Sequence, residues 1–269
     1  MSVIGNMCED RTPDGWRPGG PALYCALAAR ALGADVTLIG AIGPSCDDAL
    51  LAGIMLITPP GAAAAYENSY DRRGNRKQRL LAPGSTLDFP PGVKADALIL
   101  APAYRELARL PHDAEAPVVG VALQGALRAV AGDRVVRRRE PLRHVQPFLR
   151  PGAWAFLSEE DTVRPEELAR GVVALGAQAF VTRGARGATR YVAGEERHFA
   201  AQPATPLDPT GAGDCFAAAF IVRYAETRDL ESATAYALAA GSLAVEGAGI
   251  SGIPGRAKVE ARLRMAAAG

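Results

Sequence analysis

The sequence predicts an α/β protein with a mostly parallel central sheet flanked by helices. Short apolar runs that fit buried strands alternate with longer stretches of helical periodicity, which is typical of βαβ units. Two adjacent segments rich in Ala and Leu, residues 211–223 and 230–245, carry the apolar rhythm of helices. The 269 residues are 49% hydrophobic and 22% charged, so the chain is able to bury a sizeable core.

The expected elements follow one another along the whole chain. Strands are expected at residues 2–4, 35–39, 97–100, 117–123, 154–157 and 179–182, and further helices at 21–32 and 47–53. Two stretches fit antiparallel strand pairs, 62–81 with a turn at 71–74 and 187–199 with a turn at 193–194. Because no linker or long repeat divides the sequence, residues 1–269 are expected to form one domain with a small flap.

Charge and cysteine usage exclude several classes of partner. The chain has 30 Lys and Arg against 29 Asp and Glu, and a net charge of +1 gives no field that would hold nucleic acid or an anionic membrane. The four cysteines lack CxxC spacing and disulfide-scaffold density, which indicates a reducing compartment. No segment approaches the roughly 20 apolar residues of a membrane span. We therefore expect a cytoplasmic protein without a nucleic-acid or membrane partner.

The segment 208–216, Asp-Pro-Thr-Gly-Ala-Gly-Asp-Cys-Phe, carries the strongest chemical signal. Glycines at a helix start let backbone N–H groups close around an anion, and the helix dipole adds about half a positive charge. Asp214 falls in the same first turn, where a carboxylate would repel phosphate unless it orients and deprotonates an attacking hydroxyl. The alternative is a plain helix start that Thr210 caps and Asp214 stabilises through the dipole.

The pattern Asp-x-Thr-Gly-Ala-Gly-Asp-x-Phe resembles the signature of the ribokinase-like, or PfkB, carbohydrate kinase family. Seven fixed residues would arise by chance about once in a million in a chain of this length. Glycine-bearing segments at 18–20, 40–43, 182–187 and 241–249 follow the family order, so the resemblance covers essentially the whole chain. It implies a ribokinase-like three-layer sandwich and an ATP-dependent kinase that phosphorylates a hydroxyl of a small sugar or polyol.

The resemblance also implies roles for individual residues on the donor side. Asp214 would be the general base, and the N–H groups of Gly211, Ala212 and Gly213 would form the anion hole for the γ-phosphoryl group. The nucleotide-binding positions would be Thr182, Gly184, Gly187, Thr210, Ser242 and Gly247. A plain turn is the alternative for each of these glycines.

On the acceptor side the resemblance implies a site that differs from that of ribokinase. The positions concerned are Asp10, Gly19, Gly20, Tyr24, Gln124 and Arg128. Ribose-binding members carry Asn where this chain has Cys8 and Tyr24, which argues against ribose. Asp10 is retained, and a carboxylate there accepts hydrogen bonds from two vicinal hydroxyls.

Shorter matches at residues 5–10, 19–24 and 124–128 are similar to the myo-inositol kinase branch, which makes an inositol the first choice of substrate. A nucleoside kinase and a catalytically silent protein that binds nucleotide or polyol remain alternatives. Simple packing is the alternative for Cys8 and Tyr24. For Gln124 and Arg128 the alternatives are a helix-start turn and a surface charge.

Two further departures concern the lid and magnesium. Only residues 11–18 separate Asp10 from the paired glycines, which we interpret as too few for a strand pair, so 62–81 would be the main remnant of a reduced β lid. A monomer is then favoured, with a weak dimer left open. The segment 158–161 stands where the family has Asn-x-x-Glu, which implies Mg²⁺ near Asp161 or Glu160, usually through water. An acidic helix start fits the same segment, and a monovalent-cation requirement stays open.

Overall fold

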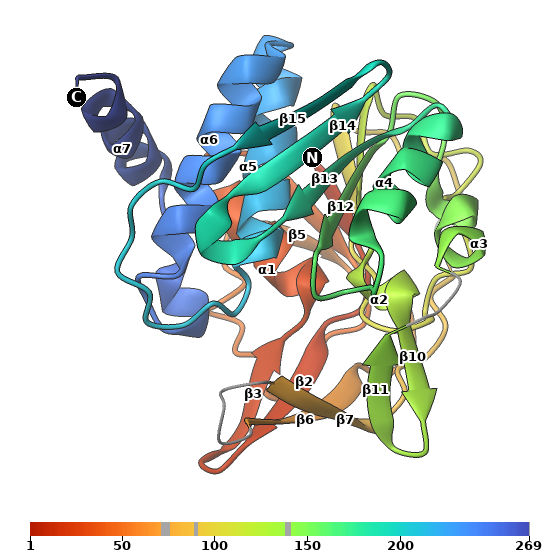
Figure 1. Cartoon of the computed structure of the whole chain (residues 1–269). Coiled ribbons are helices and arrows are strands. Elements are labelled where there is room, and N and C mark those ends of the chain that lie inside the picture. Colours follow the sequence, from red (N-terminus) through yellow and green to blue (C-terminus); the bar gives the residue numbers. More distant parts are fainter. Residues whose placement is uncertain (71–75, 89–90, 138–140, 269) are drawn as a thin grey trace.

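The computed structural model describes residues 1–70, 76–88, 91–137 and 141–268, which are organised around a nine-stranded sheet (Figure 1). The strand order is β15-β14-β13-β12-β9-β8-β1-β4-β5, and the strands from β13 to β5 run parallel. Their bounds are β1 Ser2–Ile4, β4 Val36–Ile39, β5 Ile54–Ile57, β8 Ala97–Leu100, β9 Val118–Ala122, β12 Trp154–Ser158, β13 Gln178–Thr182, β14 Ala188–Val192 and β15 Glu195–Phe199. The predicted parallel sheet and the antiparallel pair at 187–199 are confirmed.

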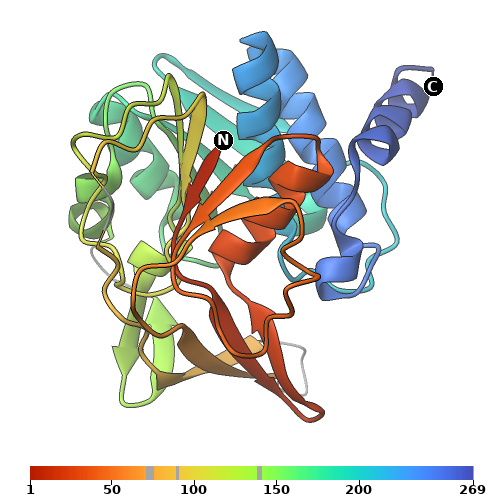
Figure 2. The ribbon, with the colours of Figure 1, turned by 180° about the vertical axis from the view of Figure 1, so that it is seen from behind.

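Helices cover both faces of this sheet and make it the middle of three layers (Figures 1 and 2). One face carries α1 (Pro21–Ala31) and α5 (Ala212–Thr227), with α6 (Leu230–Ala244) on α5 and α7 (Arg256–Ala268) on α6. The other face carries α4 (Pro165–Ala174), beside which lie the short α3 (Leu142–Val145) and α2 (Gln124–Leu127). A separate buried apolar cluster fills each interface, as the alternation of side chains along buried strands requires.

The lid is larger than the sequence analysis predicted. A second, six-stranded sheet of order β10-β11-β7-β6-β2-β3 lies at the lower edge of the molecule in Figure 1. Its strands are β2 Cys8–Thr12, β3 Gly15–Gly19, β6 Ala64–Tyr70, β7 Arg76–Ala82, β10 Arg128–Ala131 and β11 Arg134–Arg137. The expected hairpin at 62–81 is present as β6 and β7, while its turn at 71–74 lies outside the described residues.

The expectation of a reduced lid is therefore wrong, for a reason that lies in turn geometry. Thr12 pairs with Gly15 and Cys8 with Gly19, so two residues connect β2 and β3 and the eight residues 11–18 suffice. The preference for a monomer rested on the reduced lid and loses its premise. No helix within the described residues is long and apolar enough to span a membrane.

The helix expected at 47–53 is also absent: these described residues form turns. The Asp47 carboxylate accepts a hydrogen bond from the Ala49 amide at 2.9 Å, a local side-chain bond that competes with helix formation. Gly53 then has φ 78°, a left-handed conformation that leads the chain into β5. The connection between the parallel strands β4 and β5 is thus an irregular loop.

Candidate active site

The start of α5 is the segment predicted to form an anion cradle, and we call it the cradle. Gly211 is the N-cap residue of α5 and has φ 78°, a left-handed conformation that favours glycine. No side chain accepts a hydrogen bond from the amides of the first turn as a cap. The Ala212 amide donates to Pro209 O at 3.2 Å. In the described part of the chain the amides of Gly211 and Gly213 have no such internal acceptor, so these two N–H groups are the ones offered to an anion.

Asp208, rather than Thr210, orders the loop before the cradle. Its Oδ1 accepts from the Thr210 amide at 2.9 Å, and its Oδ2 accepts from the Gly249 amide at 2.8 Å. The first bond is a local Asx turn, and the second ties the cradle loop to the turn after α6. The alternative predicted for this segment, in which the Thr210 side chain caps α5, is not observed.

Tyr24 packs directly on the cradle. A Cβ atom at residue 211 would lie 2.0 Å from Tyr24 Cδ1, so only glycine fits beneath the ring. Gly249 lies at the other end of the ring, where a Cβ would be 3.4 Å from the phenol oxygen. Tyr24 belongs to the first turn of α1, a helix that begins directly after Gly20. Its ring therefore connects the predicted acceptor-binding residues to the predicted donor-binding residues.

The paired glycines bring β2 and the start of α1 close together. A Cβ at Gly19 would lie 2.3 Å from Asp10 Oδ2, and one at Gly20 would lie 2.7 Å from Cys8 Sγ. Gly20 also has φ 93°, which positions the chain to enter α1 at Pro21. The predicted acceptor residues Asp10, Gly19, Gly20 and Tyr24 are thus contiguous.

Two lid residues that the sequence analysis missed hold Asp10. Asn68 of β6 donates from Nδ2 to Asp10 Oδ1 at 3.2 Å, and Gln78 of β7 donates from Nε2 to Asn68 Oδ1 at 3.0 Å. The order of donors fixes both amide orientations, so the row Gln78–Asn68–Asp10 crosses the lid sheet toward the acceptor residues. Residues so far apart in sequence show no common spacing that would have revealed them.

Tyr24 and Cys8 are affected by carboxylates from both the lid and the start of α5. Burial raises the pKa of the Tyr24 phenol, and the charges of Asp208, Asp214 and Asp10 raise it further. Burial also raises the pKa of the Cys8 thiol; Arg128 lowers it, while Asp10 and Asp214 are among the charges that raise it. Both side chains therefore lie within electrostatic range of a carboxylate from the lid and a carboxylate from α5.

A second polar group connects α2 to the segment after β12. Arg128 Nη2 donates to Gln124 Oε1 at 2.9 Å, and Gln124 Nε2 lies 3.5 Å from Asp161 Oδ1. Asp161 Oδ2 accepts from the Ser158 amide at 2.7 Å. Burial raises the pKa of the Asp161 carboxyl, although the Ser158 amide and the Arg128 charge act in the opposite direction. Arg128 also lies over the Tyr66 ring, 5.0 Å from its centroid, so it is a buried structural cation rather than a surface charge.

The acidic segment is a poor dedicated magnesium site. Asp161 uses both oxygens within the chain, and Glu160 is exposed. No group of three or more His, Cys, Asp or Glu side chains arranged for a metal occurs among the described residues. Mg²⁺ commonly keeps several waters and binds through one or two carboxylates together with substrate phosphates. These residues fit an ion that arrives with the phosphate donor and contacts Glu160 or Asp161 through water.

The predicted donor loop lies next to the acidic segment. Thr182 at the end of β13 pairs with Ser158 at the end of β12, so both residues lie at the carboxyl ends of parallel strands. Gly184 and Gly187 have φ 54° and 91°, and a Cβ at Gly187 would lie 2.0 Å from Phe199 O. Arg183, which precedes Gly184, binds Glu166 at 2.7 Å and Glu159 at 3.6 Å, and these ion pairs fix the loop to α4 and to the acidic segment.

The other two predicted nucleotide residues make internal contacts. Ser242 Oγ accepts from the Gln202 amide at 3.2 Å. A Cβ at Gly247 would lie 2.5 Å from Gly252 Cα, so this glycine permits a tight turn after α6. The segment before the cradle therefore lies along the part of α6 that was expected to bind the nucleotide.

The thiols near the cradle are structural. Cys25 and Cys215 are buried, and burial raises the pKa of both, with the Asp214 charge acting in the same direction. The position of Cys215 at the start of α5 therefore does not lower its thiol pKa. Neither thiol is an activated nucleophile.

Comparisons with known proteins agree with this fold and motif. Residues 153–254 match the family described as pfkB family carbohydrate kinase. An 86-residue segment is 45% identical to a ribokinase of Bacillus subtilis, and this match spans 31% of the chain and 29% of that ribokinase.

Solved structures are similar over nearly the whole chain. The ribokinase of Arabidopsis thaliana in complex with ribose and ATP has a TM-score of 0.65 at 18% identity, with 98% of each chain covered. A pyrophosphate-dependent kinase in the ribokinase family, in complex with a pyrophosphate analogue and myo-inositol, has a TM-score of 0.71 at 18% identity, with 97% of this chain and 99% of that chain covered. The architecture is therefore the ribokinase-like α/β fold.

The three-layer sandwich and the second sheet define a ribokinase-like fold. Within this fold, residues 153–254 are similar to the pfkB family of carbohydrate kinases.

Proposed function

We propose that the protein is a kinase that transfers a phosphoryl group from ATP to a hydroxyl of a small polyol or sugar, with an inositol as the first choice. One observation carries this proposal: the start of α1 contacts both predicted halves of the site, because Gly19 lies against Asp10 Oδ2 and Tyr24 lies against Gly211 of the cradle. A hydroxyl-bearing molecule held by Asp10 would then lie near the carboxylate that the reaction requires.

In the proposed reaction the Asp214 carboxylate accepts the proton of the attacking hydroxyl. The oxygen forms a bond to the γ-phosphorus as the bond to the leaving ADP oxygen breaks. The Gly211 and Gly213 amides, with the α5 dipole, stabilise the charge on the transferring group. Because the transition state is loose, position and charge contribute most of the rate, and an ordinary carboxylate is a sufficient base.

The acceptor class follows from the groups around Asp10. Asn68 occupies one carboxylate oxygen as a donor, which orients the other toward Gly19 and the start of α1. A vicinal diol fits a carboxylate of this kind, and the Tyr24 ring supplies an apolar wall against the ring of a cyclic polyol. Ribose-binding members have amides at the positions of Cys8 and Tyr24, so we rank a cyclitol above ribose.

Pyrophosphate is a second candidate donor, supported by the internal contacts of Ser242 and Gly247. These residues were expected to bind the nucleotide but contact other parts of the chain. The solved kinase in complex with a pyrophosphate analogue and myo-inositol gives this alternative a precedent. In either case Mg²⁺ would neutralise donor phosphate charge, with Glu160 and Asp161 holding its water shell.

A matrix of donors and acceptors tests the proposal. Purified protein with Mg²⁺ is incubated with ATP or pyrophosphate and with inositols, hexoses, pentoses or nucleosides, and phosphorylated acceptor is measured. We expect transfer to an inositol to exceed transfer to ribose. Preferred transfer to a nucleoside would establish a nucleoside kinase, and binding without transfer to any acceptor would establish a catalytically silent protein.

A further inference from the structure

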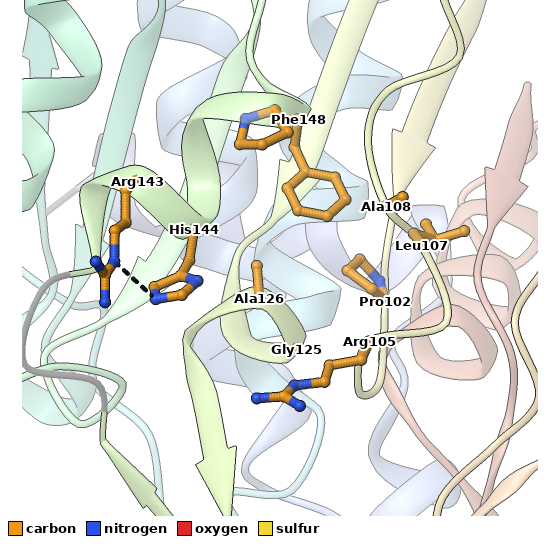
Figure 3. Close-up of a pocket in the computed structure, with 10 residues that line it drawn as sticks. Pro102, Arg105, Leu107, Ala108, Gly125, Ala126, Arg143, His144 and Phe148 are labelled. Atoms are coloured by element: carbon orange, nitrogen blue, oxygen red, sulfur yellow. Dashed lines mark hydrogen bonds between the residues drawn. The ribbon is translucent and has the colours of Figure 1, made fainter.

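A pocket of about 360 Å³ lies beside α2 and outside the residues assigned to donor and acceptor (Figure 3). We call it the α2 pocket. Its apolar lining includes Pro102, Leu107, Ala126 and Phe148, and its charged or titratable lining consists of Arg105, Arg143 and His144. All ten lining residues are described, and none is acidic. Its volume is within the usual range for small-molecule sites, about 300 to 1,000 Å³.

The basic side chains approach the pocket from two elements. Figure 3 shows Arg105 extending from the loop after β8 toward Gly125, while Arg143 and His144 come from α3. Arg143 Nε donates to His144 Nε2 at 3.3 Å, which aligns the two groups. Among the described residues Arg105 forms no ion pair, and its guanidinium lies 5.3 Å from the centroid of the Tyr104 ring.

The backbone at Arg105 is unusual. Its φ of 55° is left-handed, and Arg228 is the only other non-glycine residue among those described with a positive φ. Such a conformation costs of order 1 kcal/mol or more for a residue with a Cβ and often marks a functional loop. The neighbouring Glu106 stabilises the loop around Arg105, because its buried carboxylate accepts hydrogen bonds from the amides of Ala103, Tyr104 and Asn6.

We propose that the α2 pocket binds a small organic anion, with a phosphate or carboxylate head between Arg105, Arg143 and His144 and an apolar body against Phe148 and Leu107. The two guanidinium groups supply charge-assisted hydrogen bonds to an oxyanion, and the neutral His144 ring, whose Nε2 accepts from Arg143, donates through Nδ1. The apolar lining would contact the body of an organic anion, whereas inorganic phosphate has no apolar part to make this contact. This inference adds a second ligand site to the proposed kinase.

The loop that carries Arg105 is connected to both the lid and the acceptor side. Ala103 O accepts from Arg128 Nη1 at 2.9 Å and from the Tyr66 hydroxyl at 3.2 Å. Tyr66 belongs to β6 of the lid, and Arg128 binds Gln124. An anion that restrains Arg105 would therefore restrain a carbonyl shared by the lid and by the group around Asp161, and it would favour acceptor binding.

Binding is tested with phenyl phosphate and benzoate as probes, inorganic phosphate as the head group alone, and benzyl alcohol as the neutral control. Calorimetry is run in a Gly213→Asp background, which places a carboxylate in the cradle and excludes phosphate binding there. A Cβ at Gly213 meets no atom within 4 Å, so a side chain can start from this position without a clash of its Cβ. Arg105→Ala and Arg143→Ala are compared with Arg109→Ala, an exposed arginine of the same loop that does not line the pocket.

We expect at least one organic anion to bind, and each pocket variant to weaken it about tenfold, with no effect of Arg109→Ala. The proposal is overturned if neither organic anion binds, if Arg105→Ala and Arg143→Ala leave the affinity unchanged, or if inorganic phosphate or benzyl alcohol binds as tightly as the organic anions.

Coupling is a separate readout that rests on the proposed kinase activity. In the protein with an unaltered cradle, the bound anion should lower the acceptor KM about twofold or more, and Arg105→Ala should abolish this effect. An unchanged KM would refute the coupling but not the site. If the protein transferred phosphate to no acceptor, the calorimetry would still decide whether the α2 pocket binds an anion.

Discussion

The Tyr24 ring and Gly211 are in such close contact that a methyl group at residue 211 would lie 2.0 Å from Tyr24 Cδ1. This contact joins the first turn of α1 to the start of α5, between the segments that we propose to bind the acceptor and the donor. The cradle is consequently packed against an aromatic ring, and its shape depends on α1.

Gly211→Ala should destabilise the protein and disrupt the cradle. Alanine would clash with the ring and would also adopt φ 78°, and strain of these two kinds costs about 1 to 3 kcal/mol each. Denaturant unfolding checks the loss of stability. Gly213→Ala is the matched control, since a Cβ there meets nothing within 4 Å.

Combining Gly211→Ala with Tyr24→Ala separates the two costs. Removal of the ring should relieve the clash and leave the backbone strain, so the double variant should be more stable than the sum of the single changes predicts. Strict additivity would show that the contact with Tyr24 does not limit residue 211.

Asp214→Asn should reduce kcat about 10²-fold or more, in line with the contribution of a general base. The amide keeps the size of the side chain and the helix start but does not accept the proton of the acceptor hydroxyl. Donor affinity, measured by calorimetry, should change little. Wild-type turnover in this variant would exclude Asp214 as the base.

The fold was predictable because its signals are local. Apolar runs such as residues 97–100 and the periodicity of 211–223 depend on near neighbours in sequence. The β2–β3 hairpin was missed although Pro13-Asp14-Gly15 is a turn signal, because the eight residues 11–18 were interpreted as too few for a strand pair. The helix at 47–53 was wrongly predicted because the Asp47 carboxylate bonds an amide of its own turn.

The site was predictable only where residues share a motif. Asp214 and the cradle glycines lie within four consecutive positions, and their spacing carries the chemistry. Asn68 and Gln78 were missed because their contact with Asp10 depends on strand register in the lid, which the sequence does not encode locally. The internal contacts of Ser242 and Gly247 likewise depend on a turn that was not predicted.

The ion pair between Glu166 and Arg183 should contribute stability that acid removes. The backbone N–H of Glu166 and the Arg183 guanidinium hold the pKa of this carboxyl below its ordinary value of 4.5. A folded pKa below the unfolded one means that the unfolded chain takes up the proton first as pH falls. The contribution is therefore complete above the unfolded pKa and is lost as pH falls through the lowered pKa.

Glu166→Gln tests this dependence by denaturant unfolding between pH 7 and pH 3. Because the Glu166 side chain is 40% exposed, we expect a loss of about 0.5 kcal/mol or less at pH 7 and a smaller difference from wild type in acid. Glu167→Gln is the control, since Glu167 pairs with the exposed Arg164 outside the donor loop. A difference from wild type that grows as pH falls would contradict the assignment.

Asn68→Leu should weaken acceptor binding without altering the donor side. The leucine removes the amide that orients Asp10 and leaves a carboxylate oxygen without its 3.2 Å donor, so the acceptor KM should rise about tenfold while donor affinity stays the same. Asp10→Ala should raise the KM further or abolish turnover. Glu67→Gln is the control, because Glu67 alternates to the other face of β6 and pairs with Arg79 at 3.0 Å. If Asn68→Leu changed kcat and donor affinity but left the acceptor KM unaltered, the row Gln78–Asn68–Asp10 would have no part in acceptor recognition.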